Sequence, residues 1–410
     1  MMDSNAAILC LIPSKGRATG NAGVRQSGRS TMFGISPGHR ARVLRTTLLI
    51  MFLVSARTGF AQSGAGMVCD LRTSERIIAV GDVHGAHDQF VGILKAAGLL
   101  DNRSRWIGGR AILVQTGDIL DRGPDSRKAL DLLRRLEREA VRAGGRVYSL
   151  LGNHEVMRMV SDWRYVSAQE LDAFRTRDSA DLRERAFTIV AANVARRAQE
   201  QEQPYDEAAF HDQFVKEIPL GYLEMRQAFS PSGDYGKWLR ERPALVRIND
   251  IVFVHGGISG GTAALGCDGI NQAVRSDLAL ATPTAEQVRA MLASSETGPL
   301  WYRGLAEEPA PSFAPQVTSI LHALGARAIV IGHTAPAGFR IATRFDGRVI
   351  QIDTGMLGGT FYPGGMASAL EIRGDSLAAI YQTGREGLPA RIPALIPPAA
   401  IPALPPSQTP

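Results

Sequence analysis

The sequence predicts a layered α/β fold in which helices flank a sheet core. Three observations support this prediction. Six short apolar runs recur along the chain, polar turns that mostly contain glycine follow them directly, and helical patterns separate the early runs. With 410 residues, of which 45% are hydrophobic and 43 are glycine, the chain is large enough for one sizeable domain or two smaller ones.

The six apolar runs are predicted to be strands buried within a sheet. Each is short, contains β-branched residues and ends at polar residues, which is the pattern of a buried strand. The runs are RIIAV before Gly81, RAILVQ before Thr116, RVYSLL before Gly152, DIVFV before His255, ARAIVI before Gly332 and RVIQI before Asp353.

Two helical patterns lie between the first three runs. The first, HDQFVGILKAAG, ends at Gly98. The second, DSRKALDLLRRLEREAVRAGG, begins with Asp125 and Ser126, where a cap is expected, and stops at Gly144 and Gly145.

Two further regions depart from this alternation. Residues 158–242 are rich in Arg, Glu, Ala and Gln, and we interpret them as a mainly helical insertion that covers one face; a surface decoration without function is the alternative. Residues 389–410 are proline-rich and of low complexity, which predicts an extended, disordered tail.

Residues 1–61 have the layout of a leader with a secretory signal. Basic residues precede an apolar stretch over residues 48–54, and the small residues Gly59 and Ala61 flank the expected cut. A membrane anchor is the alternative, but the apolar stretch is well short of the ~20 residues of a spanning helix. We therefore expect a periplasmic or secreted protein without a stable membrane anchor. Because a signal rarely starts so far into a chain, we predict a true start at or near Met32.

Charge and cysteine content depend on this leader. The chain has 46 basic and 40 acidic residues, of which residues 1–61 hold eight and one; the remainder carries 38 and 39, a net charge of −1. The argument for a nucleic-acid partner then disappears. Cys69 and Cys267 remain, and they either pair in an oxidising compartment or stay as two buried thiols.

Five glycine-flanked turns at the predicted strand ends carry the polar residues of interest. Taken singly, each admits an ordinary role such as a helix cap or a solvated turn. Together they gather four of the eight histidines and three aspartates where open α/β sheets collect their ligands. The turns are GDVHG (81–85), GDILDRG (117–123), GNHE (152–155), VHGG (254–257) and GHT (332–334).

The residue types in these turns indicate a metal centre. They form a mixed oxygen and nitrogen set without thiolate, which suits a pair of divalent Mn, Fe or Zn ions and not a sulfur-rich structural zinc site. Two such ions and two carboxylates leave a charge of about +2, which can hold a hydroxide and attract a phosphate. The set is Asp82, His84, Asp118, Asn153, His255 and His333.

The order GDxHG, GDxxDRG, GNHE, HGG and GHT resembles the phosphoprotein phosphatase branch of the calcineurin-like metallophosphoesterases, over about residues 76–370. The stretches GNHEVMRMVSDWRYVS, GDYGKWLRERP and GPLWYRG are similar to the bacterial Shewanella-like phosphatases within that branch. The resemblance implies a β-sandwich core of mixed sheets flanked by helices, in a catalytic domain over residues 62–388. HGGISG lacks the proline that many relatives have after the serine, so the shape of that loop is open.

The resemblance also implies roles for the site residues. Asp82 and His84 would bind one metal, Asp118 would bridge both, and Asn153, His255 and His333 would bind the second. His154, paired with Asp121, would donate a proton to the leaving oxygen, and Arg122, with Arg303 as a second clamp, would bind phosphate. A carboxylate beside an imidazole and a guanidinium that forks onto phosphate fit these roles chemically. Glu155 has no ligand role, and we expect it to support the site structurally.

The predicted function is a dinuclear metal-dependent phosphomonoesterase in which a metal-bound hydroxide attacks phosphorus directly, without a phosphoenzyme. The substrate would be a phosphorylated protein, with Ser/Thr or Tyr preference open; only the subfamily resemblance favours tyrosine. The alternative is hydrolysis of dinucleoside polyphosphates or other small phosphate esters. A non-catalytic metal-binding scaffold is disfavoured because both His154 and Asp121 are present.

Overall fold

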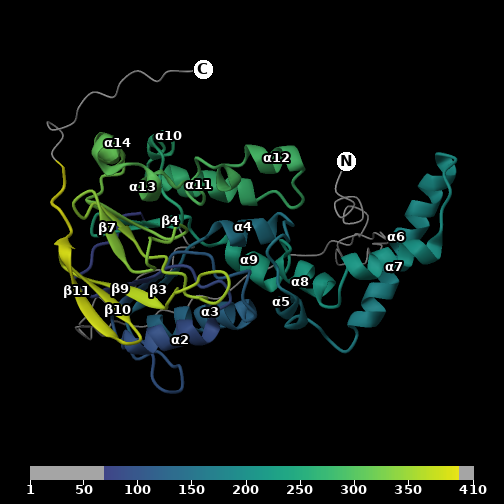
Figure 1. The fold of residues 1–410 in the computed structure, drawn as a ribbon, viewed down its shortest axis with the longest axis horizontal. Helices are drawn as coiled ribbons and strands as arrows, with labels where there is room; N and C mark the ends of the chain where they lie inside the picture. The colour runs from purple at the N-terminus through teal and green to yellow at the C-terminus, as the bar shows by residue number, and fades with distance from the viewer. Residues whose placement is uncertain (1–68, 397–410) are drawn as a thin grey trace, which may run out of the picture. The chain divides into compact units, whose positions relative to one another are not determined.

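The computed structural model describes residues 69–396, which form two mixed β-sheets packed face to face, with helices on their outer sides (Figure 1). This confirms the layered α/β fold class and the β-sandwich core. The predicted leader and secretory signal (1–61) and most of the predicted tail lie outside the described residues. Within the described residues, no helix is both long and apolar enough to cross a membrane.

The first sheet has six strands in the order β11-β10-β9-β1-β2-β3. The strands β1, β2 and β3 pair in parallel, whereas β9, β10 and β11 pair antiparallel beyond β1. The strand bounds are β1 Ile77–Val80, β2 Ile112–Gln115, β3 Arg146–Ser149, β9 Ser368–Arg373, β10 Ser376–Tyr381 and β11 Gly384–Arg391.

The second sheet has five strands in the order β4-β5-β6-β8-β7. Its three central strands β5, β6 and β8 are parallel, and β4 and β7 are antiparallel edges. The strand bounds are β4 Leu245–Ile248, β5 Ile251–Val254, β6 Ala328–Ile331, β7 Ala342–Arg344 and β8 Val349–Gln351. All six predicted strands are present across the two sheets.

Strand periodicity divides the core into layers. Ile77 and Ala79 of β1 face the second sheet, where Phe253 lies in the same apolar cluster. Ile78 and Val80 point to the opposite face and pack with the helices. Because both faces are covered, β1 is completely buried.

The helix bounds are α2 His87–Ala96, α3 Ser126–Arg142, α4 Asn153–Met159, α5 Ala168–Asp172, α6 Ser179–Glu200, α7 Glu207–Glu217, α8 Tyr222–Phe229, α9 Asp234–Arg240, α10 Gly260–Ala263, α11 Gly266–Leu278, α12 Ala285–Ala290, α13 Gly304–Glu307 and α14 Ala310–Ala323, with a 3₁₀ turn η1 Leu292–Ser294. The helices α2 and α3 pack against the first sheet and α14 packs against the second sheet in two apolar clusters, and α11 contributes residues to both clusters.

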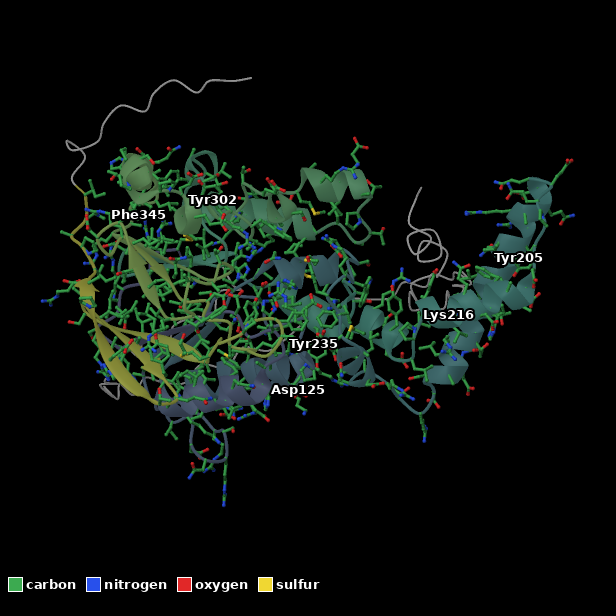
Figure 2. The ribbon with its side chains drawn as sticks, in the orientation of Figure 1. Asp125, Tyr205, Lys216, Tyr235, Tyr302 and Phe345 are labelled. Atoms are coloured by element: carbon green, nitrogen blue, oxygen red, sulfur yellow. A yellow bond between two sulfur atoms is a disulfide. The ribbon has the colours of Figure 1, made fainter. Side chains whose placement is uncertain are left out.

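Residues 158–242 are largely helical, as the sequence predicts, but they make two kinds of contact. The helices α6 and α7 share a small apolar cluster with Tyr222 at the start of α8, and they project from the sheets; in Figure 2, Lys216 marks α7 and Tyr205 marks the segment between the two helices. The helices α8 and α9 instead pack into the main core through Phe229, Tyr235 and Leu239.

The structure differs from two local predictions. Asp125 precedes α3 but makes no side-chain cap bond; its carboxylate pairs with Lys128 at 2.7 Å instead. Strand β11 continues to Arg391, three residues into the predicted tail, because pairing with β10 orders it and an edge strand tolerates Pro389. Residues 397–410 lie outside the described range.

Of the two states left open for the cysteines, the structure has the disulfide. Cys69 and Cys267 are joined with Cα atoms 5.9 Å apart, which links the segment before β1 to α11 across 198 residues.

Candidate active site

Parallel pairing brings the predicted turns to one edge of the sandwich. In the first sheet, Val80 pairs with Gln115, and Gln115 with Ser149, so the residues that follow β1, β2 and β3 leave the sheet side by side. In the second sheet, Val254 pairs with Ile331, so the residues that follow β5 and β6 also leave the sheet side by side.

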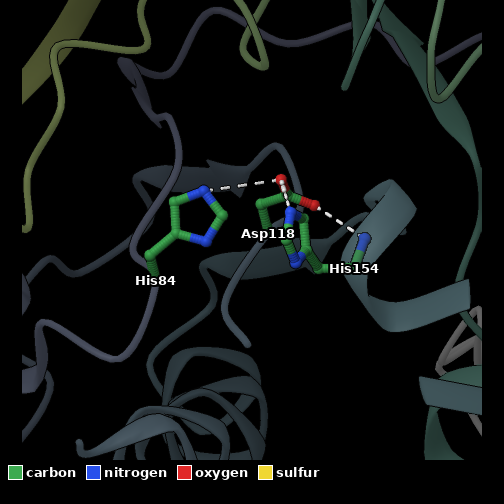
Figure 3. Close-up of side chains that lie close together, drawn as sticks. All are labelled: His84, Asp118 and His154. Atoms are coloured by element: carbon green, nitrogen blue, oxygen red, sulfur yellow. Dashed lines mark hydrogen bonds and ion pairs between the residues drawn. The ribbon is translucent and has the colours of Figure 1, made fainter. Parts of the chain in front are cut away.

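The six predicted metal ligands converge there. Asp118 is central: His84 Nε2 lies 3.6 Å from its Oδ2, and His255 Nε2 lies 3.3 Å from its Oδ1. The Oδ1 atom of Asp82 accepts a hydrogen bond from the backbone N–H of His333 at 3.0 Å. Candidate ligand atoms lie within 4.8 Å of one another in two sets, which are His84, Asp118 and His154, and Asp118, His255 and His333. Figure 3 shows the first set, with Asp118 between the two histidines.

Backbone carbonyls fix how two of these imidazoles face the site. His84 Nδ1 lies 2.9 Å from Leu120 O, and His255 Nδ1 lies 3.1 Å from Thr116 O. Because a carbonyl only accepts, we assign the ring proton to Nδ1 in each case. The Nε2 lone pairs of both rings then point into the site, as in metal-ligating histidines held by an outer hydrogen bond.

The lone pair of His255 faces another acceptor, which is the arrangement that a cation requires, whereas His84 Nε2 lies 2.7 Å from Arg122 Nη1. His255 Nε2 lies 2.8 Å from Asn153 Oδ1, and with the amide oxygen in this position neither atom can donate to the other. The Nε2 atom of His333 is buried without a hydrogen-bond partner among the described residues. Bare nitrogen and oxygen atoms buried together are unfavourable unless a positive ion lies between them, so the residues fit divalent metal ions.

The pKa values agree with metal-ligating histidines. Burial lowers the pKa of His84 to about 3 and that of His333 to about 2, so both rings are neutral and available as ligands. Burial opposes the ionisation of Asp118, but the imidazoles of His255 and His154 outweigh it and hold the pKa of Asp118 well below its usual range. The central carboxylate is therefore ionised at neutral pH.

His154 has the opposite electrostatic environment. Its Nδ1 lies 2.6 Å from Asp121 Oδ2, and its Nε2 lies 3.7 Å from Asp118 Oδ2. Burial would lower the pKa of His154, but Asp118 and Asp121 outweigh it and raise this pKa above its usual value. A protonated ring whose Nε2 faces the metal ligands is the geometry of a general acid.

The two predicted arginines lie at different depths. Arg122 is half-buried between the rings of Tyr165 and Tyr362, with its guanidinium carbon 5.7 and 5.5 Å from their centres. Its Nη2 lies 3.5 Å from His154 Nε2, so a phosphate on Arg122 would adjoin the acid. Arg303 is exposed and donates to His333 O at 3.1 Å, which places it at the rim of the site.

Glu155 has the structural role that its lack of a ligand function suggests. Its carboxylate is fully buried and accepts backbone hydrogen bonds from Gly152, Asp118, Ile119 and Leu120 at 2.8 to 3.3 Å. It therefore ties the start of α4 to the loop that carries Asp118.

The backbone at the site is strained. Five predicted site residues have φ in the left-handed region, where non-glycine residues cost about 1–3 kcal/mol each. Such conformations persist only where surrounding bonds impose them, which is typical of functional loops. The residues and their φ values are His84 at 46°, Asp118 at 55°, Asp121 at 72°, Arg122 at 67° and His333 at 62°.

Sequence analysis missed three residues of the site. Asp353 follows β8, and burial raises its pKa to about 6. Its position after a strand and before Thr-Gly was the signal in the sequence that could have identified it. Tyr362 bonds Arg122 from a glycine-rich loop, whose composition was the signal. Arg158, buried in α4, pairs with Asp121, and only an arginine inside the apolar run EVMRMV hinted at it.

Comparisons with known proteins agree with this geometry. A family model described as calcineurin-like phosphoesterase matches residues 75–337. Shewanella-like protein phosphatase 2 of Arabidopsis thaliana is 31% identical over 320 residues, which are 74% of this chain and 76% of the relative. Shewanella-like protein phosphatase 1 of Plasmodium berghei is 26% identical over 291 residues, 70% of this chain and 68% of the relative.

A solved structure is similar throughout the same region. The cold-active protein-tyrosine phosphatase of a psychrophilic Shewanella species superposes with a TM-score of 0.57 at 25% identity, over 78% of this chain and 82% of that one. This likeness agrees with the resemblance seen in the sequence motifs.

Proposed function

The chain belongs to the calcineurin-like phosphoesterase family and is a metal-dependent phosphoesterase, and we propose that it is a protein phosphatase that works with two divalent cations. The observation that carries the proposal is the pairing of His154 with Asp121 at 2.6 Å, beside Arg122 and the converging ligands. An acid, a phosphate clamp and a cation site are what phosphate ester hydrolysis needs.

The donor set supports two cations. Asp82, His84 and Asp118 would hold one, and Asp118 with Asn153, His255 and His333 would hold the other; the two groups of converging atoms contain His84, Asp118, His255 and His333, and hydrogen-bond distances place Asp82 beside His333 and Asn153 beside His255. When bound, divalent ions such as Mn, Fe or Zn lower the pKa of a coordinated water and neutralise charge on phosphoryl oxygens.

The chain's own residues would bind phosphate and supply a proton. Arg122 would bind phosphoryl oxygens, and the exposed Arg303 is a candidate for a second contact from the rim. His154 would hold a proton at Nε2 and give it to the leaving oxygen, while Asp121 keeps the Nδ1 proton in place. The same pair would stabilise the charged ring before transfer.

A His154→Ala variant tests the assignment. It should retain its metal content by elemental analysis and lose about 10² to 10⁴ of its turnover on phosphopeptides, the usual contribution of acid catalysis. Full activity would reject the proton-donor role. Wild-type turnover on phosphotyrosine and phosphoserine peptides and on diadenosine tetraphosphate would identify the substrate class, and a large excess on the dinucleotide would overturn the protein phosphatase assignment.

The proposal includes export to the periplasm or beyond. The disulfide between Cys69 and Cys267 supports it, because structural disulfides persist in oxidising compartments. Fractionation of cells that produce the full chain, with N-terminal sequencing of the mature protein, tests it; a reduced, unprocessed protein in the cytoplasm would contradict it.

A further inference from the structure

Arg158 has an environment unlike that of any other described arginine. Among residues 69–396 it is the one arginine that is buried, and its side chain has no exposed surface. Its guanidinium lies over the ring of Trp163 at 4.7 Å and over that of Phe229 at 5.6 Å, and Nη1 contacts the sulfur of Met225 at 2.6 Å. The apolar surroundings leave the cation with few partners.

The charged partner of Arg158 is the carboxylate that holds His154. Nη2 of Arg158 donates to Oδ1 of Asp121, whereas Oδ2 of Asp121 accepts from Nδ1 of His154. The backbone N–H of Asp121 also donates to Glu170 Oε1 at 3.1 Å. Asp121 is therefore held from three sides, and each of its oxygens has a separate role.

We propose that Arg158 is a positioning residue for the proton transfer of this enzyme. By holding Oδ1 of Asp121, it keeps Oδ2 on Nδ1 of His154 and so aims Nε2 at the leaving oxygen. The inference rests on the proposed role of His154 as the proton donor. Arg158 acts through Asp121, because its side chain bonds or stacks on Asp121, Met225, Trp163 and Phe229 and its charge also acts on Glu170, and none of these is Arg122 or a predicted metal ligand.

Stability alone gives a weak reason for this arginine. A buried ion pair adds little to stability because the desolvation of both charges offsets their attraction. Removing Arg158 leaves Asp121 and Glu170 buried close together without their counter-charge, and such a loss is strongly destabilising. A useful variant must therefore keep the charge or remove a carboxylate as well.

The dependence of rate on the leaving group separates positioning from general damage. When the ester bond breaks, its electron pair stays on the leaving oxygen, and the proton from His154 Nε2 neutralises that oxygen. Phenol needs this proton, whereas 2,4-dinitrophenol leaves readily as the anion. A fault in proton delivery therefore slows phenyl phosphate hydrolysis much more than 2,4-dinitrophenyl phosphate hydrolysis.

Arg158→Lys keeps the charge but loses the planar fork. We expect kcat on phenyl phosphate to fall by about 10- to 10²-fold, as for a misplaced catalytic group, with kcat on 2,4-dinitrophenyl phosphate within about twofold of the wild type. KM and metal content should not change. Arg242→Lys is the matched control, because Arg242 also pairs with a carboxylate, that of Glu137 at 2.7 Å, and also lies over a tryptophan ring, that of Trp238 at 5.0 Å. This control substitution should change neither rate.

The outcomes are distinguishable. Equal losses on both substrates in Arg158→Lys overturn the positioning role, and so does wild-type behaviour. If His154→Ala itself shows no leaving-group dependence, the proton-donor assignment fails and the role of Arg158 fails with it. If Arg158→Lys does not fold, the same rates are measured for the double variant Arg158→Met with Glu170→Gln, which removes one charge of each sign. A loss of rate confined to phenyl phosphate supports the proposal, and any other result overturns it.

Discussion

Replacing Glu155 with glutamine should destabilise the protein severely although the side chain keeps its size. One carboxylate oxygen accepts from the N–H groups of Gly152 and Asp118, and the other from those of Ile119 and Leu120. A glutamine has a single oxygen, so its NH₂ group would face two backbone donors. Losing two hydrogen bonds to a charged group at about 1.5–3 kcal/mol each predicts a loss of about 3–6 kcal/mol.

Urea unfolding followed by circular dichroism measures this loss. Burial raises the pKa of Glu155, and the charge of Asp118 raises it further while the amide donors lower it, so the comparison is made at pH 8, because alkaline pH favours the ionised carboxylate. Glu75→Gln is the control, because Glu75 pairs with Arg110 in an exposed ion pair worth about 0–1 kcal/mol. If the Glu155→Gln variant unfolds within about 1 kcal/mol of the wild type, the four-bond anchor is wrong.

Three further predictions concern the disulfide, the cations and one carboxylate. Replacing Cys69 and Cys267 with serine should cost about 4–5 kcal/mol, because the loop of 198 residues is then unconstrained in the unfolded chain; an unchanged urea midpoint would contradict this. Removal of the divalent cation with EDTA should lower the free energy of unfolding by about 2.7 kcal/mol relative to a sample that contains the cation at 100 times its dissociation constant. An unchanged melting temperature would argue against a resident metal. Burial would raise the pKa of Glu139, but hydrogen bonds from the backbone of Trp106 and from Arg135 outweigh burial and lower this pKa. The ionised Glu139 carboxylate therefore stabilises the folded protein fully above pH 4.5, and this stabilisation is lost as the pH falls through the pKa that Glu139 has in the folded state. Glu139→Gln should therefore destabilise by about 1 kcal/mol at pH 7, with a difference that shrinks below pH 4.5 in acid titrations; a constant difference would refute this.

The sequence predicted strands where burial dictates residue type. Five of the six runs are interior strands of the two sheets, where both faces are covered and apolar residues are favourable, and the sixth, RVYSLL, is the edge strand β3. The strand β11 was missed because its partner defines it. Strand β11, GREGLPAR, is mostly exposed and contains a proline, and only its pairing with β10 makes it a strand.

The residues of the site also divide into those that the sequence predicts and those that only the folded chain reveals. Ligand types and their order could be read from the turns because glycine and strand ends mark them. The left-handed conformations at Asp118 and Asp121 could not, since neither residue type requires a positive φ. Arg158 and Asp353 were missed because each reaches the site from outside the five glycine-flanked turns, and only the folded chain brings them to it.

The histidines of the site show how one residue type serves two chemistries. His84 and His333 are buried, and their pKa values fall to about 3 and about 2, so that they present lone pairs. His154 is buried to a similar degree, yet Asp118 and Asp121 raise its pKa, so that it presents a proton. The sequence shows no difference between these residues beyond their neighbours, and burial is common to them. What separates ligand from acid is the charge beside each ring: burial keeps His84 neutral, with only a backbone carbonyl on its Nδ1, whereas Asp118 and Asp121, the second of which Arg158 holds, raise the pKa of His154.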